Sequence, residues 1–317
     1  MVEVGVKHVR SKEERKYYNR KVLRRNLIGT LMAAPPFLGF VLCTLVPMAI
    51  SLWISFTELH GSMLKNAQWV AVENYVRIFN DPLVFKALGN TLFYCLIVPV
   101  NIFICLFLAN LLYSHEIMGS KMLRILFFLP QVCTGTAVTL MWSYVFSNTG
   151  MVNTLLNNLG GKLFLPYQLV KDYRIALTFI SVWQNGTNII LMQAALANVD
   201  KTLQEAARID GATEMKVFWK ITFPSISPTF FYMLIMNMIH AAQEMALMSV
   251  FMGSPEKADF AGLTVSWYIY YTATGAKSMS PGYGYGFASA LSWVYSIFLI
   301  IVTRIAFKLS DKWVKYD

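Results

Sequence analysis

Six long stretches without a charged residue constrain the fold of this chain more than any other feature. No Asp, Glu, Lys or Arg occurs in residues 26–57, 87–115, 125–161, 175–199, 221–243 or 278–303. Each stretch holds the ~20 residues that a helix needs to cross ~30 Å of hydrocarbon. The runs are too long and too uniformly apolar for barrel strands. The sequence therefore predicts an all-α membrane protein with six transmembrane helices, near residues 29–54, 88–112, 123–146, 175–197, 225–250 and 286–308.

The distribution of positive charge predicts how these helices are oriented. With the N-terminus inside, the termini and loops on that side carry 19 of the 27 Lys and Arg residues, and the other side carries 8. The positive-inside rule therefore predicts that both termini are cytoplasmic. The net charge of +10 follows from this asymmetry and gives no reason to expect nucleic-acid binding. We predict a basic cytoplasmic segment over residues 1–26 and a single transmembrane domain over residues 27–317, with a cytoplasmic loop at residues 199–224.

That cytoplasmic loop is polar and carries helix signals of its own. Thr202 followed three residues later by Glu205 is a capping box, which marks a helix start. Gly211 provides a C-terminal stop, because glycine tolerates the left-handed conformation. Thr213 is placed to cap a second short helix, and Pro224 indicates that the next span starts near it. The predicted order is helix, glycine break, helix and proline. An amphipathic loop that lies on the membrane surface is the alternative.

The same loop resembles the EAA loop of the membrane subunits of ABC importers. The residues that match are Glu205, Ala206, Ala207, Asp210, Gly211, Ala212, Phe218, Ile221, Pro224 and Pro228. The flanking segments resemble the sugar-permease branch, which includes the maltose and glycerol-phosphate permease subunits, at Ala33-Ala34-Pro35, Val46-Pro47, Trp69-Val70, Glu73-Asn74-Tyr75, Asn90-Thr91 and residues 286–292. The resemblance covers roughly residues 27–308. It departs at Met252-Gly253-Ser254-Pro255, where many relatives carry threonine–glycine–glycine–proline, so it predicts nothing for that external loop.

This resemblance implies a type I ABC importer transmembrane domain in the bacterial cytoplasmic membrane. It implies that the chain pairs with a second, related permease subunit and receives its solute, a carbohydrate, from an extracytoplasmic binding protein. It also implies that the EAA loop docks on a dimer of cytoplasmic ATPase subunits, which bind ATP and Mg, so that this subunit binds no cofactor itself. The residues expected to couple to the ATPase are Glu205, Ala206, Ala207, Asp210, Gly211, Ala212, Phe218 and Pro224.

An enzymatic function has little support in the sequence. The Gly161-Lys162 dipeptide lacks the earlier glycine that a Walker A loop requires. There is no His-Glu-x-x-His motif, the four histidines are scattered, and the four cysteines have no metal-like spacing. We therefore predict neither catalytic nor metal-binding residues in this chain.

Polar side chains inside the apolar spans are the remaining candidates for function, because such residues are expensive in a membrane and usually face the bundle interior. In the fourth span, Trp183, Gln184, Thr187 and Asn188 form a polar cluster. In the fifth span, Asn237, His240 and Glu244 share one face of a helix. A sugar offers hydroxyls to amides and a carboxylate, and a ring face to an aromatic side chain. Hydrogen bonding between helices is the structural alternative for each residue. The candidates for the substrate pathway are Trp183, Gln184, Asn185, Asn188, Asn237, His240, Gln243 and Glu244.

Two other classes of membrane protein remain as alternatives. An ion-gradient-driven secondary transporter or channel would often show inverted repeats, and a membrane-embedded transferase would need a convergent catalytic set; neither feature is found. The solute is not identified by the sequence: an oligosaccharide is favoured, with glycerol-phosphate, uronate oligomers and polyols as alternatives. Because the predicted spans hold almost no Lys or Arg, a neutral sugar is favoured unless the partner subunit supplies the charge.

Overall fold

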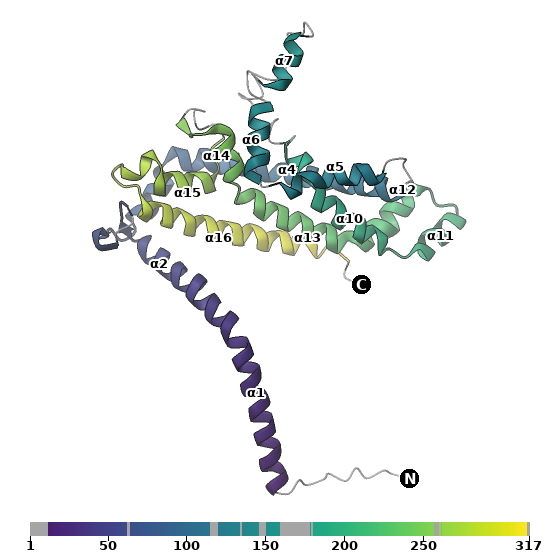
Figure 1. The fold of residues 1–317 in the computed structure, drawn as a ribbon, viewed down its shortest axis with the longest axis horizontal. Helices are drawn as coiled ribbons and strands as arrows, with labels where there is room; N and C mark the ends of the chain where they lie inside the picture. The colour runs from purple at the N-terminus through teal and green to yellow at the C-terminus, as the bar shows by residue number, and fades with distance from the viewer. Residues whose placement is uncertain are drawn as a thin grey trace. The chain divides into compact units, whose positions relative to one another are not determined.

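A computed structural model of the chain describes residues 12–61, 64–114, 120–133, 135–145, 150–158, 178, 180–256, 260 and 262–315. The chain divides into two compact units, Met1–Ile54 and Ser55–Asp317. The first unit contains helix α1 (Lys12–Phe40), a π-helical turn η1 (Val41–Leu45) and helix α2 (Val46–Ile54) in direct succession (Figure 1). Helix α1 continues through the boundary predicted between residues 26 and 27. The segment Arg25–Ile54 is long and apolar enough to cross a membrane.

Two helices of the second unit are also long and apolar enough to span a membrane: α4 (Pro82–Ser114) and α16 (Tyr285–Ser310). Helices α5 (Ser120–Val132) and α6 (Gly135–Val145) qualify only as a pair, bent by 110°. The described part of the chain thus contains three candidate spans, or four if the bent pair is one span. The prediction of six spans remains a prediction.

The fourth and fifth predicted spans are interrupted in the structure. A short helical stretch at residues 180–183 ends before α10 (Gly186–Ala197), which has only 12 residues. Helix α13 (Phe223–Ala242) ends before a non-helical segment that leads into α14 (Ala246–Met252). The interruptions contain Gln184 and Asn185 in the fourth span and Gln243 and Glu244 in the fifth, whereas Asn188, Asn237 and His240 lie within helices.

Helices α4, α10 and α13 pack against one another around an apolar core (Figure 1). Its most deeply buried side chains come from all three helices. Removal of apolar side chains from water is the main favourable contribution to the stability of such a core. The small Ala109 of α4 is fully buried in this core. The other central members are Ile102, Cys105, Met192, Leu196, Ile226 and Met233.

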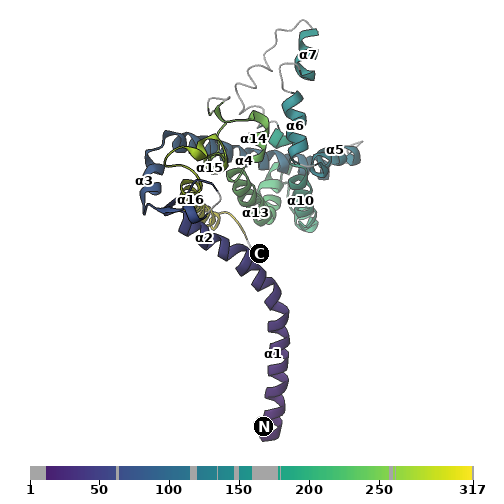
Figure 2. The ribbon, with the colours of Figure 1, turned by 60° about the vertical axis from the view of Figure 1, so that its left-hand side comes forward.

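A second core lies where α3 (Glu73–Asn80) and α15 (Val265–Thr274) pack on the first turns of α16 (Figure 2). Tyr268 and Phe287 are its largest fully buried side chains. Beside it, strands β1 (Thr57–Glu58) and β2 (Gln68–Trp69) form an antiparallel pair, flanked by the short helix η2 (Leu64–Asn66). Helix η5 (Ala276–Met279) follows α15, and α7 (Met151–Asn158) follows α6.

Three amide and hydroxyl side chains tie this second core together. Asn74 donates to the carbonyl oxygens of Ser55 and Thr57, both at 2.9 Å. Asn90 Nδ2 donates to Leu263 O at 3.0 Å, and Thr91 Oγ1 accepts from the backbone N–H of Val265 at 3.0 Å. Asn74, Asn90 and Thr91 belong to segments that carry the resemblance noted above, and the structure gives all three a structural role.

A buried carboxylate also holds this end of the molecule together. Asp81 accepts hydrogen bonds from the hydroxyl groups of Tyr268 and Tyr283 and lies 3.6 Å from Lys277 Nζ. The ammonium of Lys277 in turn lies over the ring of Tyr283, 4.0 Å from its centroid. Asp81 Oδ1 accepts from the backbone N–H of Leu83 at 2.9 Å, which places this charge at the start of α4.

Candidate functional site

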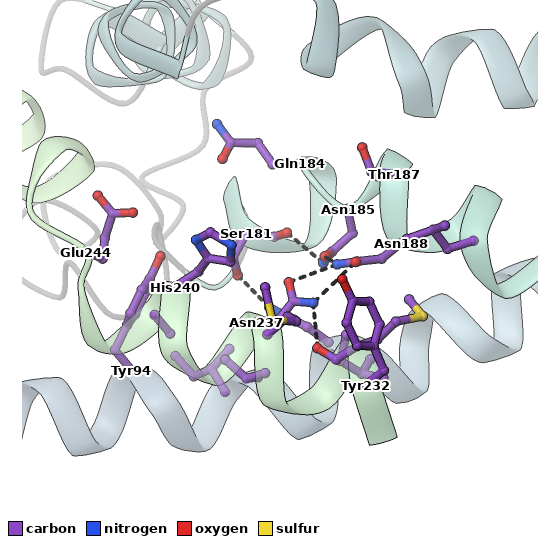
Figure 3. A pocket seen from close by; sticks show the side chains of 18 of the residues that line it. Tyr94, Ser181, Gln184, Asn185, Thr187, Asn188, Tyr232, Asn237, His240 and Glu244 are labelled. Atoms are coloured by element: carbon purple, nitrogen blue, oxygen red, sulfur yellow. Dashed lines mark hydrogen bonds between the residues drawn. The ribbon is translucent and has the colours of Figure 1, made fainter. Parts of the chain in front are cut away.

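A cavity of about 410 Å³, lined by both polar and apolar side chains, lies between α4, α10 and α13 (Figure 3). Cavities that bind small molecules in proteins usually have volumes of about 300–1,000 Å³. The walls combine apolar side chains from the core between α4, α10 and α13 with polar groups from four segments of the chain. The polar lining residues are Tyr94, Asn101, Gln131, Ser181, Gln184, Asn185, Thr187, Asn188, Tyr232, Asn237, His240 and Glu244.

Six of the eight residues named above as pathway candidates line this cavity: Gln184, Asn185, Asn188, Asn237, His240 and Glu244. The other two do not. Trp183 packs edge-on against Trp142, with ring centroids 5.2 Å apart. Gln243 follows the last residue of α13 and lines a separate, largely apolar groove beside α16.

The sequence reasoning missed several lining residues, of which Asn101, Gln131 and Tyr94 carry polar groups on the second and third predicted spans. Asn101 and Gln131 stand out as amides inside apolar runs, so the rule applied to the fourth and fifth spans would have found them. Tyr94 and Tyr232 had no such signal, because tyrosine is common in membrane helices for other reasons.

Reciprocal hydrogen bonds between two amides join α10 to α13 inside the cavity (Figure 3). Asn188 Nδ2 donates to Asn237 Oδ1 at 3.0 Å, and Asn237 Nδ2 donates to Asn188 Oδ1 at 3.2 Å. Asn188 Nδ2 also donates to Asn185 Oδ1 at 2.8 Å. Asn101 Nδ2 of α4 donates to Ser181 Oγ at 2.8 Å. These amides therefore connect the helices that form the cavity, as the structural alternative predicts.

Other polar groups of the cavity make no side-chain hydrogen bond within the described part of the chain. They are the amide of Gln184, the hydroxyls of Tyr94, Thr187 and Tyr232, and the imidazole of His240. The side-chain carbonyl oxygen of Asn101, Oδ1, is buried and likewise accepts no hydrogen bond from the described residues. Buried polar atoms normally have a partner. A molecule that brings hydroxyl groups into the cavity would satisfy these atoms.

Glu244 is the one carboxylate among the described residues that line the cavity. Its Oε1 accepts from the backbone N–H of Leu247 at 2.7 Å, so it binds the first turn of α14. Its own backbone oxygen accepts from Thr264 Oγ1 at 2.8 Å. No Lys or Arg of the described residues lies within ion-pairing distance of it.

The loop predicted to couple to an ATPase forms two helices, α11 (Lys201–Ile209) and α12 (Glu214–Val217). The prediction that Thr202 caps the first helix is wrong, because Asp200 is the N-cap and its Oδ1 accepts from the backbone N–H of Thr202 at 2.8 Å. A carboxylate interacts more favourably than a hydroxyl with the positive end of a helix. The hydrogen bonds from Thr202 lower the pKa of Asp200 from its ordinary value.

The glycine stop in this loop is confirmed. Gly211 has a φ of +79°, and the N–H groups of Gly211 and Ala212 bond to the carbonyls of Arg208 and Ala207 at 3.0 and 2.9 Å. This is the Schellman pattern that ends many helices. Thr213 occupies the N-cap position of α12, as expected, although its side chain makes no capping hydrogen bond.

The next span was predicted to start near Pro224, and α13 does begin at Phe223, although no gap separates it from α12. Helix α12 continues through a π-helical turn η3 (Phe218–Thr222) into α13, so residues 214–242 are helical without interruption. The π turn adds one residue per turn, and the N–H of Phe223 bonds to the carbonyl of Phe218. This wider turn accommodates a proline, which has no N–H and would otherwise clash with the preceding turn.

The eight residues of the expected coupling motif are divided between surface and interior. Glu205, Ala206, Asp210 and Gly211 are exposed, and the remaining four are partly buried. Phe218 packs edge-on against Trp219, with ring centroids 5.2 Å apart. Large apolar side chains are also exposed on this loop, including Ile209 at 86% and Met215 at 67%. The partly buried members are Ala207, Ala212, Phe218 and Pro224.

Residues 83–316 match a family of known proteins described as the binding-protein-dependent transport system inner membrane component. The probable ABC transporter permease protein YesP of Bacillus subtilis (strain 168) is 32% identical over 306 residues, which cover 94% of this chain and 95% of that protein. The lactose transport system permease protein LacF of Rhizobium radiobacter is 30% identical over 302 residues, covering 91% and 96%. The sn-glycerol-3-phosphate transport system permease protein UgpA of Salmonella typhi is 26% identical over 305 residues, covering 94% and 99%.

The fold is similar to that of a bacterial ABC transporter involved in the import of the acidic polysaccharide alginate. The similarity covers 94% of this chain and 100% of that one, with a TM-score of 0.71 at 21% identity. A second structure, of the bacterial alginate ABC transporter in complex with an alginate pentasaccharide-bound periplasmic protein, gives a TM-score of 0.70 at 22% identity, covering 92% and 96%.

Proposed function

This chain belongs to the family of binding-protein-dependent transport system inner membrane components, and we propose that it is one of two related permease subunits of an ATP-driven importer for a carbohydrate. It forms half of the translocation pathway, and its solute occupies the cavity between α4, α10 and α13. The chain itself has no catalytic role, because ATP and Mg bind to a dimer of partner ATPase subunits. An extracytoplasmic binding protein delivers the solute.

One observation carries this proposal: a continuous helix joins the loop to the cavity. Residues 214–242 run from α12 through η3 into α13, and Asn237 on the same helix lines the cavity. At 1.5 Å per residue, Glu214 and Asn237 are about 35 Å apart along this helix. Helix α10, which precedes the loop, also lines the cavity. A force applied to α11 and α12 therefore acts directly on two walls of the cavity.

The mechanism follows from this connection. ATP binding closes the ATPase dimer and displaces the exposed part of α11 and α12 that docks on it. Helix α13 transmits the displacement, and the two permease subunits rock from inward-facing to outward-facing. The Schellman turn at Gly211 and the cap at Asp200 keep the loop rigid enough to act as a lever. The eight motif residues from Glu205 to Pro224 are the proposed coupling site.

In this arrangement the chain crosses the membrane six times, with both termini in the cytoplasm. The bent pair α5 and α6 forms the third span, and the fourth and fifth are interrupted helices. Irregular backbone within a membrane is tolerated where it lines a cavity, and Gln184 and Glu244 lie at the two interruptions and line this one. An oligosaccharide is the proposed solute class, which is supported by the lactose relative and by the groups that lack partners.

The proposal is tested by reconstitution. The chain would be co-purified with the products of neighbouring genes and placed in liposomes with ATP inside and the binding protein with saccharides outside. We expect one saccharide to stimulate both ATP hydrolysis and uptake. Gly211→Asp and Glu205→Lys should uncouple hydrolysis from uptake in a complex that still assembles. Normal uptake by either variant would refute the assignment of the loop.

Matched controls separate coupling from general damage. Gly61→Asp makes the same change at a glycine with a φ of +76° and no atom within 4 Å of an added Cβ, like Gly211, but outside the loop. Glu73→Lys reverses an exposed charge on α3. Both controls should transport normally. A chain that moved its solute under an ion gradient, alone and without ATP, would instead establish a secondary transporter or channel.

A further inference from the structure

We propose that this cavity accepts an uncharged, hydroxyl-rich carbohydrate and rejects carbohydrates that carry carboxylate or phosphate groups, with Glu244 as the residue that makes this selection. The inference rests on the proposed function and specifies the charge of its solute. The relatives make the distinction meaningful, because one is described as a lactose permease and a similar structure as an importer of an acidic polysaccharide.

The charges around the cavity form the first argument. Glu244 contributes a carboxylate, and no Lys or Arg of the described residues lines the cavity. Helices α10 and α13 contain neither residue type, and α4 contains only Lys86, near its first turn. An anionic group that left water for this cavity would find no cation on these walls and would be repelled by Glu244.

The hydrogen-bonding capacity of the walls forms the second argument. The side-chain oxygen of Asn101, Oδ1, can only accept hydrogen bonds. It is buried and has no partner within the described part of the chain. Glu244 uses Oε1 to bind Leu247 N, and Oε2 has no partner there. The buried Asn101 oxygen needs a donor, and Oε2 of the half-buried Glu244 is free to accept a hydrogen bond from one. A hydroxyl group donates and accepts, whereas an ionised carboxylate only accepts.

The remaining free groups of the cavity suit hydroxyls equally well. Gln184, Thr187 and His240 each carry atoms that can donate and atoms that can accept. Tyr94 and Tyr232 add hydroxyls and aromatic ring faces (Figure 3). In the same view Tyr94, His240 and Glu244 lie towards one end of the cavity, and Thr187 and Asn188 lie towards the other. The carboxylate of Glu244 next to groups that both donate and accept suits a chain of sugar hydroxyls.

The test compares sugars that differ only in charge. The complete importer, reconstituted with its partner permease, ATPase and binding protein, would be offered trisaccharides of the gluco, galacto and manno series and their uronate counterparts, which carry a carboxylate in place of the C6 hydroxymethyl group. We expect ATP-driven uptake of a neutral trisaccharide to exceed that of its uronate at least tenfold. ATP-driven uptake of a uronate that equals or exceeds that of every neutral sugar would overturn the inference and leave the importer assignment standing.

The role of Glu244 is tested separately, in nanodiscs that hold the membrane complex without the binding protein, so that only the membrane cavity selects. Glu244→Gln keeps an oxygen for Leu247 N and removes the charge. It should lower the preference for the neutral sugar over the uronate about tenfold, because the uronate is no longer repelled by a carboxylate. Glu73→Gln, which removes an exposed carboxylate outside the cavity, should leave the preference unchanged. An unchanged preference in Glu244→Gln would refute the assignment. Uptake that requires an ion gradient and no ATP would refute the importer function itself.

Discussion

Arg208 and Glu214 form a two-point ion pair across the glycine turn that separates α11 from α12. Arg208 Nε lies 2.7 Å from Glu214 Oε1, and Arg208 Nη2 lies 3.0 Å from Oε2. This fork geometry fixes direction as well as distance. The hydrogen bonds from Arg208 lower the pKa of Glu214 from its ordinary value. The pair therefore helps to set the angle between two helices that we propose transmit force.

Reversing either charge of this pair should impair coupling. Arg208→Glu or Glu214→Arg places like charges on opposite sides of the turn, so solute uptake per ATP hydrolysed should fall. The double variant, with both residues exchanged, should recover most of the loss because the attraction is restored. Uptake and hydrolysis would be measured together in liposomes. Equal losses in the double variant and in the single variants would show that the pair itself has no role.

The same loop should loosen in acid. The folded loop holds the pKa values of Asp200 and Glu214 below their ordinary values of 3.8 and 4.5. A lowered pKa in the folded state stabilises the fold at pH values above the ordinary pKa, and this contribution is lost as pH falls through the folded value. Hydrogen-exchange protection of residues 201–217 should therefore decrease below about pH 4 relative to that of α16. Constant relative protection from pH 7 to pH 3 would contradict this linkage.

Gly186 should not tolerate a side chain. A Cβ atom there would collide with the backbone carbonyl of Phe127 on α5, so α10 could not approach α5 as it does. Overpacking of this kind costs about 1–3 kcal/mol. Gly186→Ala should lower the thermal midpoint of the purified complex. Gly89→Ala is the matched control, because nothing lies within 4 Å of its added Cβ inside helix α4. Equal midpoints for the two variants would contradict the close packing.

Asp81→Asn should destabilise the end of the molecule where α4, α15 and α16 meet. The change leaves Lys277 without its counter-charge, and its side chain is only 20% exposed. Removing one partner of a buried ion pair typically costs on the order of 3 kcal/mol. The thermal midpoint should fall and should be partly restored by adding Lys277→Met. A variant as stable as the unmodified complex would show that the tyrosine hydroxyls alone hold this cluster together.

The reciprocal amides of Asn188 and Asn237 should show a measurable coupling energy. A double-mutant cycle with alanine at each position should give about 1 kcal/mol of interaction in membrane mimetics. Each single variant should lower the stability of the complex. Its affinity for solute should fall only as far as this loss of stability explains. A coupling energy near zero, together with a strong loss of solute affinity, would instead make the two residues solute ligands.

Local chemistry made the structure of the loop at residues 199–224 largely predictable from sequence. Glycine at position 211 supplies a left-handed residue where the chain needs one, so the turn and the two helices follow from a few neighbouring residues. The cap was misassigned because Asp200 and Thr202 are both good capping residues and stand two positions apart. Only the geometry of the first turn distinguishes them.

The interruptions of the fourth and fifth spans were not predictable in the same way. The segment around Gln184 reads as part of one apolar run, and it breaks where Gly186 packs against the backbone at Phe127. That contact joins residues far apart in sequence. For the same reason Trp183 was expected near the solute and lies against Trp142. Which face of a span meets a cavity depends on packing that sequence periodicity does not encode.

The π-helical turn η3 has a consequence for insertions and deletions in this chain. Because the turn holds one residue more than an α-helical turn, it sets the rotation of α13 about its own axis relative to α12. Deleting a single residue between Phe218 and Thr222 would rotate everything beyond it by about 100°. Asn237 would then face away from Asn188, although the deletion lies about four to five helical turns before Asn237, roughly 25 Å along the helix. The number of residues in this turn is therefore as important to the cavity as the identity of the residues that line it.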